Sequence, residues 1–493
     1  MRTLLNLCGL LLLIVSSSLH ANERSTAKHF EKIKTDPVLL RQFLYAFPKG
    51  GDLHNHIDGA IYAENMIIWA AADGHCVNLE SLELSAAPCA PQDNRPSVAG
   101  VKNNADIVNK IIDAFSVRNY QLRSRSGADQ FFSTFSKFFL ATFGREGDML
   151  SEVTQRAANQ NIGYLELMQS WNMGDARASV HQLEHQERLI DQAAAKTSAQ
   201  IDGIEARRRE LQNCDQDDAA TGCQVKVRYL AQVLRNFPRD QVRAQTKLAV
   251  RMMQRDPRVV GLNFVAAEHD PTSIRDYRWQ MKMIAEEAAI LAEDKRNISL
   301  HAGELALGLV PPEELGFHVR EAIEVAGAKR IGHAVDVIYD SDVAELLKNM
   351  ANNDIAVEIN LTSNDVILGV SGDQHPFELF RKYVVPLTIS TDDEGVSRID
   401  LTHEYQRAIE TYDLSYGDIK QMARNALEYS FLEGESLFLG GDLGQVFSAC
   451  KKEFSNKTYS NSICGEFLNT NAKAKAQSEL EQDFMIFEDI YDK

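Results

Sequence analysis

The sequence predicts an α/β protein built on a (β/α)8 TIM barrel, with a helical extension before the barrel and long inserted loops. The chain of 493 residues is too long for one domain of about 150 residues, and its 44% apolar and 25% charged residues are typical of a globular protein. Eight short apolar segments alternate with stretches of helical period. Strands that alternate with helices pair in parallel through crossovers, and eight such units suggest a closed barrel. A doubly wound open sheet is the alternative that this alternation leaves open.

The barrel is expected to occupy residues 49–433, between an N-terminal helical extension at 22–48 and a C-terminal helical tail at 434–493. Two connections exceed what a barrel needs, and we interpret them as insertions at 74–126 and 172–224. The predicted strands, in chain order, are 51–58, 163–168, 225–231, 259–265, 298–301, 330–335, 355–360 and 386–391.

The first 21 residues have the pattern of a secretory signal peptide. Arg2 gives a positive start, residues 4–15 are almost continuously apolar, and Leu19-His20-Ala21 offers a cleavage site after Ala21. The apolar run is too short to span a bilayer core of roughly 30 Å, and an uncleaved anchor is the alternative. We therefore expect an exported protein, periplasmic or secreted, with no membrane attachment once the signal is cleaved.

Charge and cysteine content agree with this expectation. The formal net charge of −18 argues against nucleic-acid or anionic-membrane partners, which need a basic face. Six cysteines follow the signal segment and allow fifteen connectivities, among which we favour disulfides between near neighbours over free thiols. The favoured pairs are Cys76 with Cys89, Cys214 with Cys223 and Cys450 with Cys464.

Metal-type side chains follow four of the eight predicted strands. His54 and His56 stand at positions i and i+2 of the first strand, so both imidazoles face the same side and can converge on one ion. His301 and His333 end two later strands, and Asp392 ends the last. Because barrel enzymes place their chemistry at the carboxyl ends of the strands, these side chains are expected to meet. Three imidazoles and a carboxylate suit zinc or a similar divalent ion.

Six short motifs stand in order along residues 49–393. They are KGGDLHNHIDG at 49–59, HAGE at 301–304, RIGH at 330–333, EINLTSN at 358–364, HP at 375–376 and STDD at 390–393. Together they resemble the motifs of the adenosine deaminase family, within the metal-dependent amidohydrolase superfamily. The signal segment and N-terminal extension are similar to the secreted adenosine-deaminase-related growth factors. The insertions do not match the receptor-binding insertion of that branch, so growth-factor activity is not inferred.

The resemblance implies one Zn²⁺ per chain, bound by His54, His56, His301 and Asp392. Such an ion lowers the pKa of a bound water and makes a nucleophile at neutral pH. The resemblance also places His333 beside that water, as a base or as an electrostatic anchor.

The remaining implied roles concern the purine and the ribose. Glu304, one helical turn past His301, would donate a proton to purine N1, which requires a carboxyl kept protonated in a dry pocket. Asp393 would accept from N7 or share a proton with it, Asp58 would hold the ribose 5′-hydroxyl, and the backbone N–H of Ala266 would contact N3.

Other readings of these residues stay open. Glu304 could be a carboxylate that favours a helix N-terminus, Asp393 could cap the following helix, and His375 could be a turn residue. The chain also departs from the family, which usually has glycine where Ala266 stands and proline where Glu394 stands. The second departure puts the shape of the loop over the purine and ribose, and therefore the substrate range, in doubt.

The expected reaction is hydrolytic deamination of adenosine, and of 2′-deoxyadenosine, to the inosine product and ammonia in purine salvage. Asp58 and the net negative charge would repel the dianionic phosphate of AMP. The alternatives are an amidohydrolase acting on a related aminopurine such as AMP or adenine, and an extracellular nucleoside-binding or signalling protein. The helices expected within 23–47 offer a surface for a homodimer.

Overall fold

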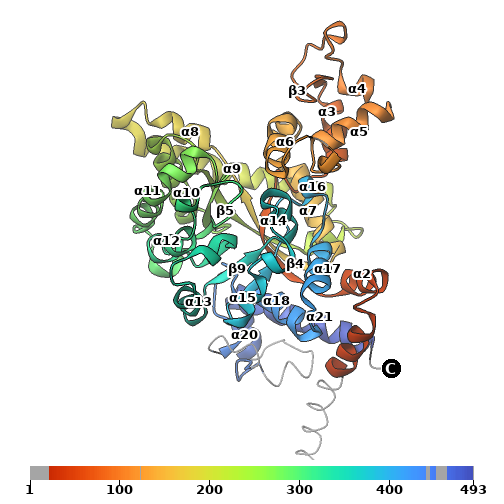
Figure 1. The fold of residues 1–493 in the computed structure, drawn as a ribbon, viewed down its shortest axis with the longest axis vertical. Coiled ribbons are helices and arrows are strands. Elements are labelled where there is room, and N and C mark those ends of the chain that lie inside the picture. The colour runs from red at the N-terminus through yellow and green to blue at the C-terminus, as the bar shows by residue number, and fades with distance from the viewer. Residues whose placement is uncertain (1–21, 123, 440–444, 451–462, 492–493) are drawn as a thin grey trace, which may run out of the picture.

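The computed structural model describes residues 22–122, 124–439, 445–450 and 463–491 (Figure 1). The predicted signal peptide at 1–21, with its cleavage site after Ala21, lies outside the described residues. Within the described ranges, no helix combines the length and the apolar character needed to cross a bilayer.

Eight parallel strands form a closed barrel. They make two four-stranded sheets, in the orders β1-β4-β5-β6 and β10-β9-β8-β7. Parallel bridges between Leu262 and Ile298 and between Asn55 and Asp392 join the two sheets at both seams. The barrel strands are β1 (Gly50–His56), β4 (Ile162–Gln169), β5 (Lys226–Leu234), β6 (Val259–Val265), β7 (Ser299–Ala302), β8 (Arg330–His333), β9 (Ala356–Ile359) and β10 (Leu387–Ile389). The predicted barrel is confirmed, and the open sheet is excluded.

Helices cover the barrel, and their apolar faces explain their positions (Figure 1). In α10 the buried residues include Val242, Ala249 and Met252, which recur at helical spacing. Asp270 begins α11 by accepting hydrogen bonds from two backbone N–H groups. The helices are α2 (Pro37–Ala46), α3 (Ala63–Ala72), α4 (Val98–Val101), α5 (Ala105–Ala114), α6 (Gly127–Thr142), α7 (Glu146–Asn159), α8 (Met173–Ser179), α9 (Gln186–Leu211), α10 (Arg239–Arg255), α11 (Pro271–Ala288), α12 (His318–Glu324), α13 (Val343–Asn352), α14 (Leu361–Leu368), α15 (Phe377–Lys382), α16 (Glu394–Ser397), α17 (Leu401–Tyr412), α18 (Tyr416–Glu428), α20 (Ile463–Thr470) and α21 (Ala472–Asp489).

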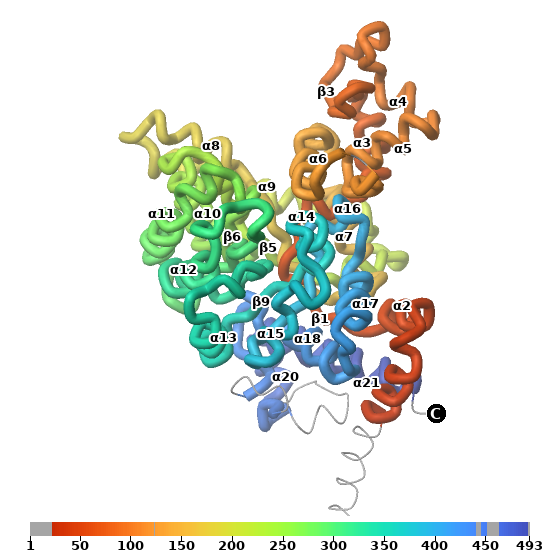
Figure 2. The backbone as a smooth tube through the Cα atoms, viewed as in Figure 1, coloured from red at the N-terminus to blue at the C-terminus, as the bar shows by residue number. Residues whose placement is uncertain are grey.

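The two ends of the described chain pack together beside the start of β1. Residues 22–33 are helical, and α2 follows them. The ring of Phe43 in α2 lies 5.0 Å from that of Phe487 in α21, so both termini share one apolar cluster (Figure 2). The buried ammonium of Lys49 donates to the carbonyls of Leu44, Phe47 and Gln160, which fixes the extension to the first strand.

The two long connections differ in form. Residues between α3 and α5, including the short pair β2 (Cys76–Val77) and β3 (Leu84–Ser85), project from the barrel as an arm (Figure 2). In the other connection α9 packs against α7 and α10, as a crossover helix between β4 and β5 would. Disulfides confirm the three local pairings: Cys76–Cys89, Cys214–Cys223 and Cys450–Cys464.

Candidate active site

The carboxyl ends of three strands bring the predicted metal ligands together. His54 and His56 of β1, His301 of β7 and Asp392 after β10 are all buried, and one ligand atom of each lies within 4.8 Å of the others. The Nε2 atom of His301 is 3.1 Å from that of His54 and 3.3 Å from that of His56. The Oδ1 atom of Asp392 is 3.5 Å and 3.2 Å from the same two nitrogens.

These separations fit one tetrahedral cation. Ligands at 2.0–2.1 Å from zinc lie about 3.3 Å apart along the edges of a tetrahedron. Three imidazole nitrogens at such separations, with a carboxylate beside them, repel one another unless a cation or protons lie between them. Three nitrogens and one oxygen are a donor set that zinc accepts. The residues present therefore fit the metal that the sequence motifs imply.

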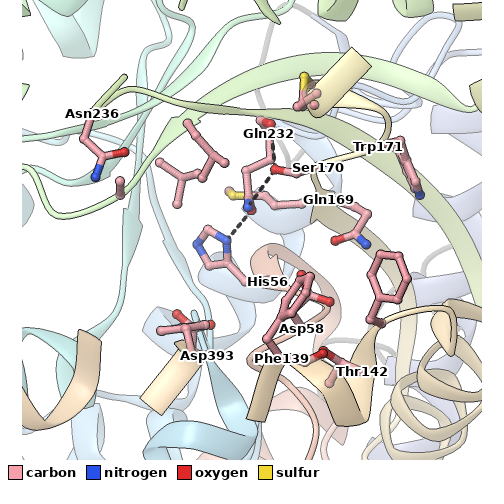
Figure 3. A pocket seen from close by; sticks show the side chains of 18 of the residues that line it. His56, Asp58, Phe139, Thr142, Gln169, Ser170, Trp171, Gln232, Asn236 and Asp393 are labelled. Atoms are coloured by element: carbon pink, nitrogen blue, oxygen red, sulfur yellow. Dashed lines mark hydrogen bonds between the residues drawn. The ribbon is translucent and has the colours of Figure 1, made fainter. Parts of the chain in front are cut away.

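A second layer of side chains orients each histidine ligand. The Nδ1–H of His54 donates to the carboxylate of Glu358 at 2.7 Å. The Nδ1–H groups of His56 and His301 donate to the amide oxygens of Gln232 and Asn263, each at 2.7 Å. Figure 3 shows Gln232 between His56 and Ser170. With Nδ1 protonated, every Nε2 lone pair points at the shared ligand position, as metal-bound histidines require.

Sequence analysis did not identify Gln232 or Asn263 as site residues. Both are amide side chains near the ends of strands β5 and β6. An amide in an otherwise apolar strand is a usable signal, because it needs a hydrogen-bond partner wherever the fold removes it from water.

Three residues at the strand ends that carry the site have a positive φ. The φ angles of Ala266, His333 and Asp392 are +89°, +70° and +59°. A residue with a Cβ that adopts this left-handed conformation does so at a cost of about 1–2 kcal/mol. Ala266, where the family usually has glycine, therefore keeps its backbone N–H in a glycine-like conformation under strain.

Glu304 and Asp393 are buried acids beside the metal ligands. Burial, together with the charges of Asp392 and Glu268, raises the pKa of Glu304 well above its usual range. Burial also raises the pKa of Asp393 well above its usual range, and the charge of Asp392 adds to this effect. Glu268 accepts the backbone N–H groups of Gly303 and Glu304, which fixes the turn that carries Glu304. Both shifts favour the protonated form of these acids.

The structure decides between the alternative roles that the sequence left open for Glu304 and Asp393. Glu304 lies in a loop and not one helical turn past His301, because Gly303 turns the chain with a φ of +79°. A helix-end role for Glu304 therefore does not apply. Asp393 precedes α16, but its carboxylate makes no capping hydrogen bond. Glu394 is buried and pairs with the guanidinium of Arg156 at 3.0 Å.

A cavity of about 1160 Å³ opens over these groups. Figure 3 shows Asp58 and Asp393 at this cavity, with Phe139 of α6 and Trp171 on its walls. Burial and the nearby charge of Glu146 raise the pKa of Asp58 to about 6. The predicted site residues that line the cavity are His56, Asp58, Ala266, His301, Glu304, Asp392 and Asp393.

His333 lies behind the metal ligands rather than on the cavity wall. Its Nε2 atom is 3.8 Å from Asp392 Oδ2, and its Nδ1 atom is 3.9 Å from Glu304 Oε1. Burial lowers the pKa of His333 to about 3, so this imidazole is neutral near pH 7. His375, expected as a turn residue, is buried and contacts the same region through Asn364.

The sequence profile of the adenosine deaminase family matches residues 147–437. The chain belongs to the adenosine deaminase family. This family is metal-dependent, which agrees with the cluster of histidines and aspartate described above.

Curated relatives match over a shorter stretch. The adenosine deaminase of Escherichia coli strain SMS-3-5 is 37% identical over 140 residues, 28% of this chain and 39% of that protein. The adenosine deaminase of Clostridium perfringens strain SM101 is 29% identical over 163 residues, 33% of this chain and 44% of that protein. The chain thus spans about two fifths of the length of the curated relatives it matches.

Solved structures with a similar fold are more distant in sequence. The N6-methyl-AMP deaminase of Arabidopsis thaliana has a TM-score of 0.50 and 22% identity, covering 80% of this chain and 94% of that one. The adenine deaminase of Arthrobacter aurescens has a TM-score of 0.50 and 14% identity, and the match covers 78% of this chain and 94% of that one. These likenesses show the fold.

Proposed function

We propose that this chain is an exported zinc-dependent deaminase that converts adenosine, and 2′-deoxyadenosine, to the inosine product and ammonia. The observation that carries the proposal is the tetrahedral spacing of His54, His56, His301 and Asp392 beside a buried acid with a raised pKa. Three disulfides support an oxidising compartment such as a periplasm or the extracellular space.

In this proposal, different residues act on different positions of the purine ring. A zinc ion at the four ligands would supply the Lewis acidity that brings the pKa of water toward neutrality. Glu304, protonated in its buried loop, donates its proton to purine N1 and so makes C6 more electrophilic. Asp393 hydrogen-bonds N7, and the N–H of Ala266 contacts N3. Glu304 and Asp393 are buried at the bottom of the cavity, where a lower effective dielectric strengthens these interactions.

Charge in the cavity favours a nucleoside over a nucleotide. Asp58, which we assign to the ribose 5′-hydroxyl, has Glu146 as a like-charged neighbour. A 5′-phosphate there would meet two carboxylates. Two cations line the described cavity, but Lys196 pairs with Asp175 at 2.8 Å and Arg177 lies over the ring of Phe237. Neither cation is among the charges that shift the pKa of Asp58, which are those of Glu146 and His56.

The proposal is tested by comparing kcat/KM for adenosine, 2′-deoxyadenosine, adenine, AMP and N6-methyl-AMP with the zinc-loaded protein. Adenosine and its 2′-deoxy analogue should be the preferred substrates, and a preference for either nucleotide would refute the assignment of Asp58. Binding of adenosine without turnover would instead favour a nucleoside-binding protein.

A single substitution tests the acid. Glu304→Gln should abolish turnover while zinc content stays near that of the wild type, because Glu304 is not a ligand. Glu313→Gln, at an exposed position, is the matched control. An active Glu304→Gln enzyme would show that N1 receives its proton from another group.

A further inference from the structure

A chain of hydrogen bonds runs through the buried interior behind His333. The backbone N–H of Phe377 donates to Nδ1 of His375 at 3.2 Å. Nε2 of His375 is 3.1 Å from Oδ1 of Asn364, and Nδ2 of Asn364 is 2.8 Å from Nδ1 of His333. His375 is 3% exposed, and the other two side chains are fully buried.

The direction of this chain follows from its first donor. A backbone N–H can only donate, so Nδ1 of His375 must carry a lone pair. Burial, with a smaller effect of Arg407, lowers the pKa of His375 to about 3, so the ring is neutral. A neutral imidazole with a lone pair on Nδ1 carries its proton on Nε2. His375 therefore donates from Nε2 to Asn364.

The orientation of the Asn364 amide then has one solution. Its oxygen must face the donor on His375, which leaves the NH₂ group facing His333. The amide donates to Nδ1 of His333, which therefore carries a lone pair. Glu304 does not compete for this nitrogen, because its carboxylate stands 3.9 Å away.

We propose that His375 is a positioning residue that, through Asn364, holds His333 as the tautomer with its proton on Nε2. His333 then presents an N–H toward Asp392 Oδ2, which at 3.8 Å is too far for a hydrogen bond, and Nε2 has no hydrogen-bond partner among the described residues. Of the two roles that the family resemblance left open, the electrostatic anchor fits this tautomer, because it can act through an N–H donor, and the general base does not. This consequence for catalysis rests on the proposed deaminase function, whereas the tautomer itself does not.

The tautomer can be measured directly. In protein labelled with ¹⁵N-histidine and loaded with Zn²⁺, protonated and unprotonated imidazole nitrogens give well-separated ¹⁵N signals in long-range ¹H–¹⁵N spectra. His333→Gln identifies the signals of His333. At neutral pH we expect a protonated Nε2 and an unprotonated Nδ1. The opposite pattern would overturn the proposal.

We call the hydrogen-bonded chain from His375 through Asn364 to His333 the relay. Asn364→Asp changes its hydrogen bonding with a side chain of nearly the same size. The aspartate carboxylate accepts from both neighbours, so His333 must move its proton to Nδ1. We expect the two ¹⁵N signals of His333 to exchange character and kcat to fall by about 10²–10³-fold with little change in KM, as when one fixed donor is lost from a reaction centre. Ser363→Ala is the control, because the buried hydroxyl of Ser363 has no hydrogen-bond partner among the described residues.

Two substitutions of His375 provide a second test if the aspartate variant does not fold. His375→Gln keeps an N–H donor for Asn364 and should preserve the Nε2-protonated pattern. His375→Leu removes the donor, frees the amide to turn, and should lose the single pattern. Identical spectra and kcat for these two variants would refute the relay. A wild-type protein with the expected tautomer but no deaminase activity would refute the proposed function and leave the relay standing.

Discussion

Glu358→Gln isolates what one buried carboxylate does for the metal ligand His54. Glu358 is fully buried and accepts from His54 Nδ1 at 2.7 Å, Arg330 Nε at 2.6 Å and Ser299 Oγ at 2.8 Å. Burial alone would raise its pKa, but Arg330 and His54 together hold it at about 2, against an ordinary value of 4.5. Glutamine has the same shape and lacks the charge.

The size of the effect follows from this shift. A carboxyl whose pKa falls from 4.5 to about 2 on folding contributes about 3 kcal/mol to the free energy of unfolding at neutral pH. Because the folded-state pKa is depressed, this contribution is present above pH 4.5 and is lost as the pH falls toward 2. The wild type should therefore exceed Glu358→Gln by about 3 kcal/mol at pH 7, and the difference should shrink in acid.

Metal affinity should fall as well. With the glutamine oxygen turned to Arg330, its NH₂ group faces His54 Nδ1 and favours the tautomer whose proton occupies the ligand position. We expect zinc affinity to fall by about 10–100-fold. Urea unfolding of the metal-free protein measures the stability, and competition with a chromophoric chelator measures the affinity.

The control for this experiment is Glu404→Gln. Glu404 is also fully buried and accepts from Thr362, but burial raises its pKa to about 7. Glu404→Gln should therefore leave the zinc affinity unchanged. It should also not produce the pH-dependent loss in the free energy of unfolding that is expected of Glu358→Gln. Equal zinc affinity in Glu358→Gln and the wild type would refute the orienting role of Glu358.

Three further outcomes are expected. Ala266→Gly relieves a φ of +89° and should raise the free energy of unfolding by roughly 0.5–1 kcal/mol in urea titrations, the strain relieved less the added chain entropy; a lower value would contradict the strain. Serine at both Cys76 and Cys89 removes the disulfide that closes a short loop, and such a constraint on the unfolded chain contributes about 3 kcal/mol to the free energy of unfolding. The arm should become sensitive to proteases while kcat stays unchanged. A loss of activity together with this sensitivity would show that the arm supports the site. Removing zinc with a chelator should lower Tm and abolish turnover, with both restored by added Zn²⁺; an unchanged Tm would argue against a metal bound to the folded state.

The barrel could be predicted from sequence because its signal is repeated. Each of the eight strands is a short apolar run followed by a helix, and the polar residues after the strands must meet at one end. The same logic indicated candidate ligands, since His54 and His56 alternate along one strand and His301 ends another predicted strand. The choice of the four ligands came from the resemblance to the adenosine deaminase family.

Other features depend on tertiary contacts that leave no local pattern. The pairing of His375 with Asn364 joins residues 11 apart through a buried amide, and His375-Pro376 reads locally as a turn. The partners of the ligands, Gln232 and Asn263, look like isolated polar residues in apolar strands until the barrel brings them beside the histidines. The positive φ of Ala266 is likewise set by closure of the loop after β6 and not by the preference of alanine.

The most direct test of the whole account is X-ray absorption at the zinc edge of the loaded protein, combined with metal analysis. The account predicts one zinc per chain, with three nitrogen ligands and one carboxylate oxygen from the protein at about 2.0–2.2 Å. Sulfur in the coordination shell, or only one histidine nitrogen, would contradict the convergence of His54, His56, His301 and Asp392 on a single ion.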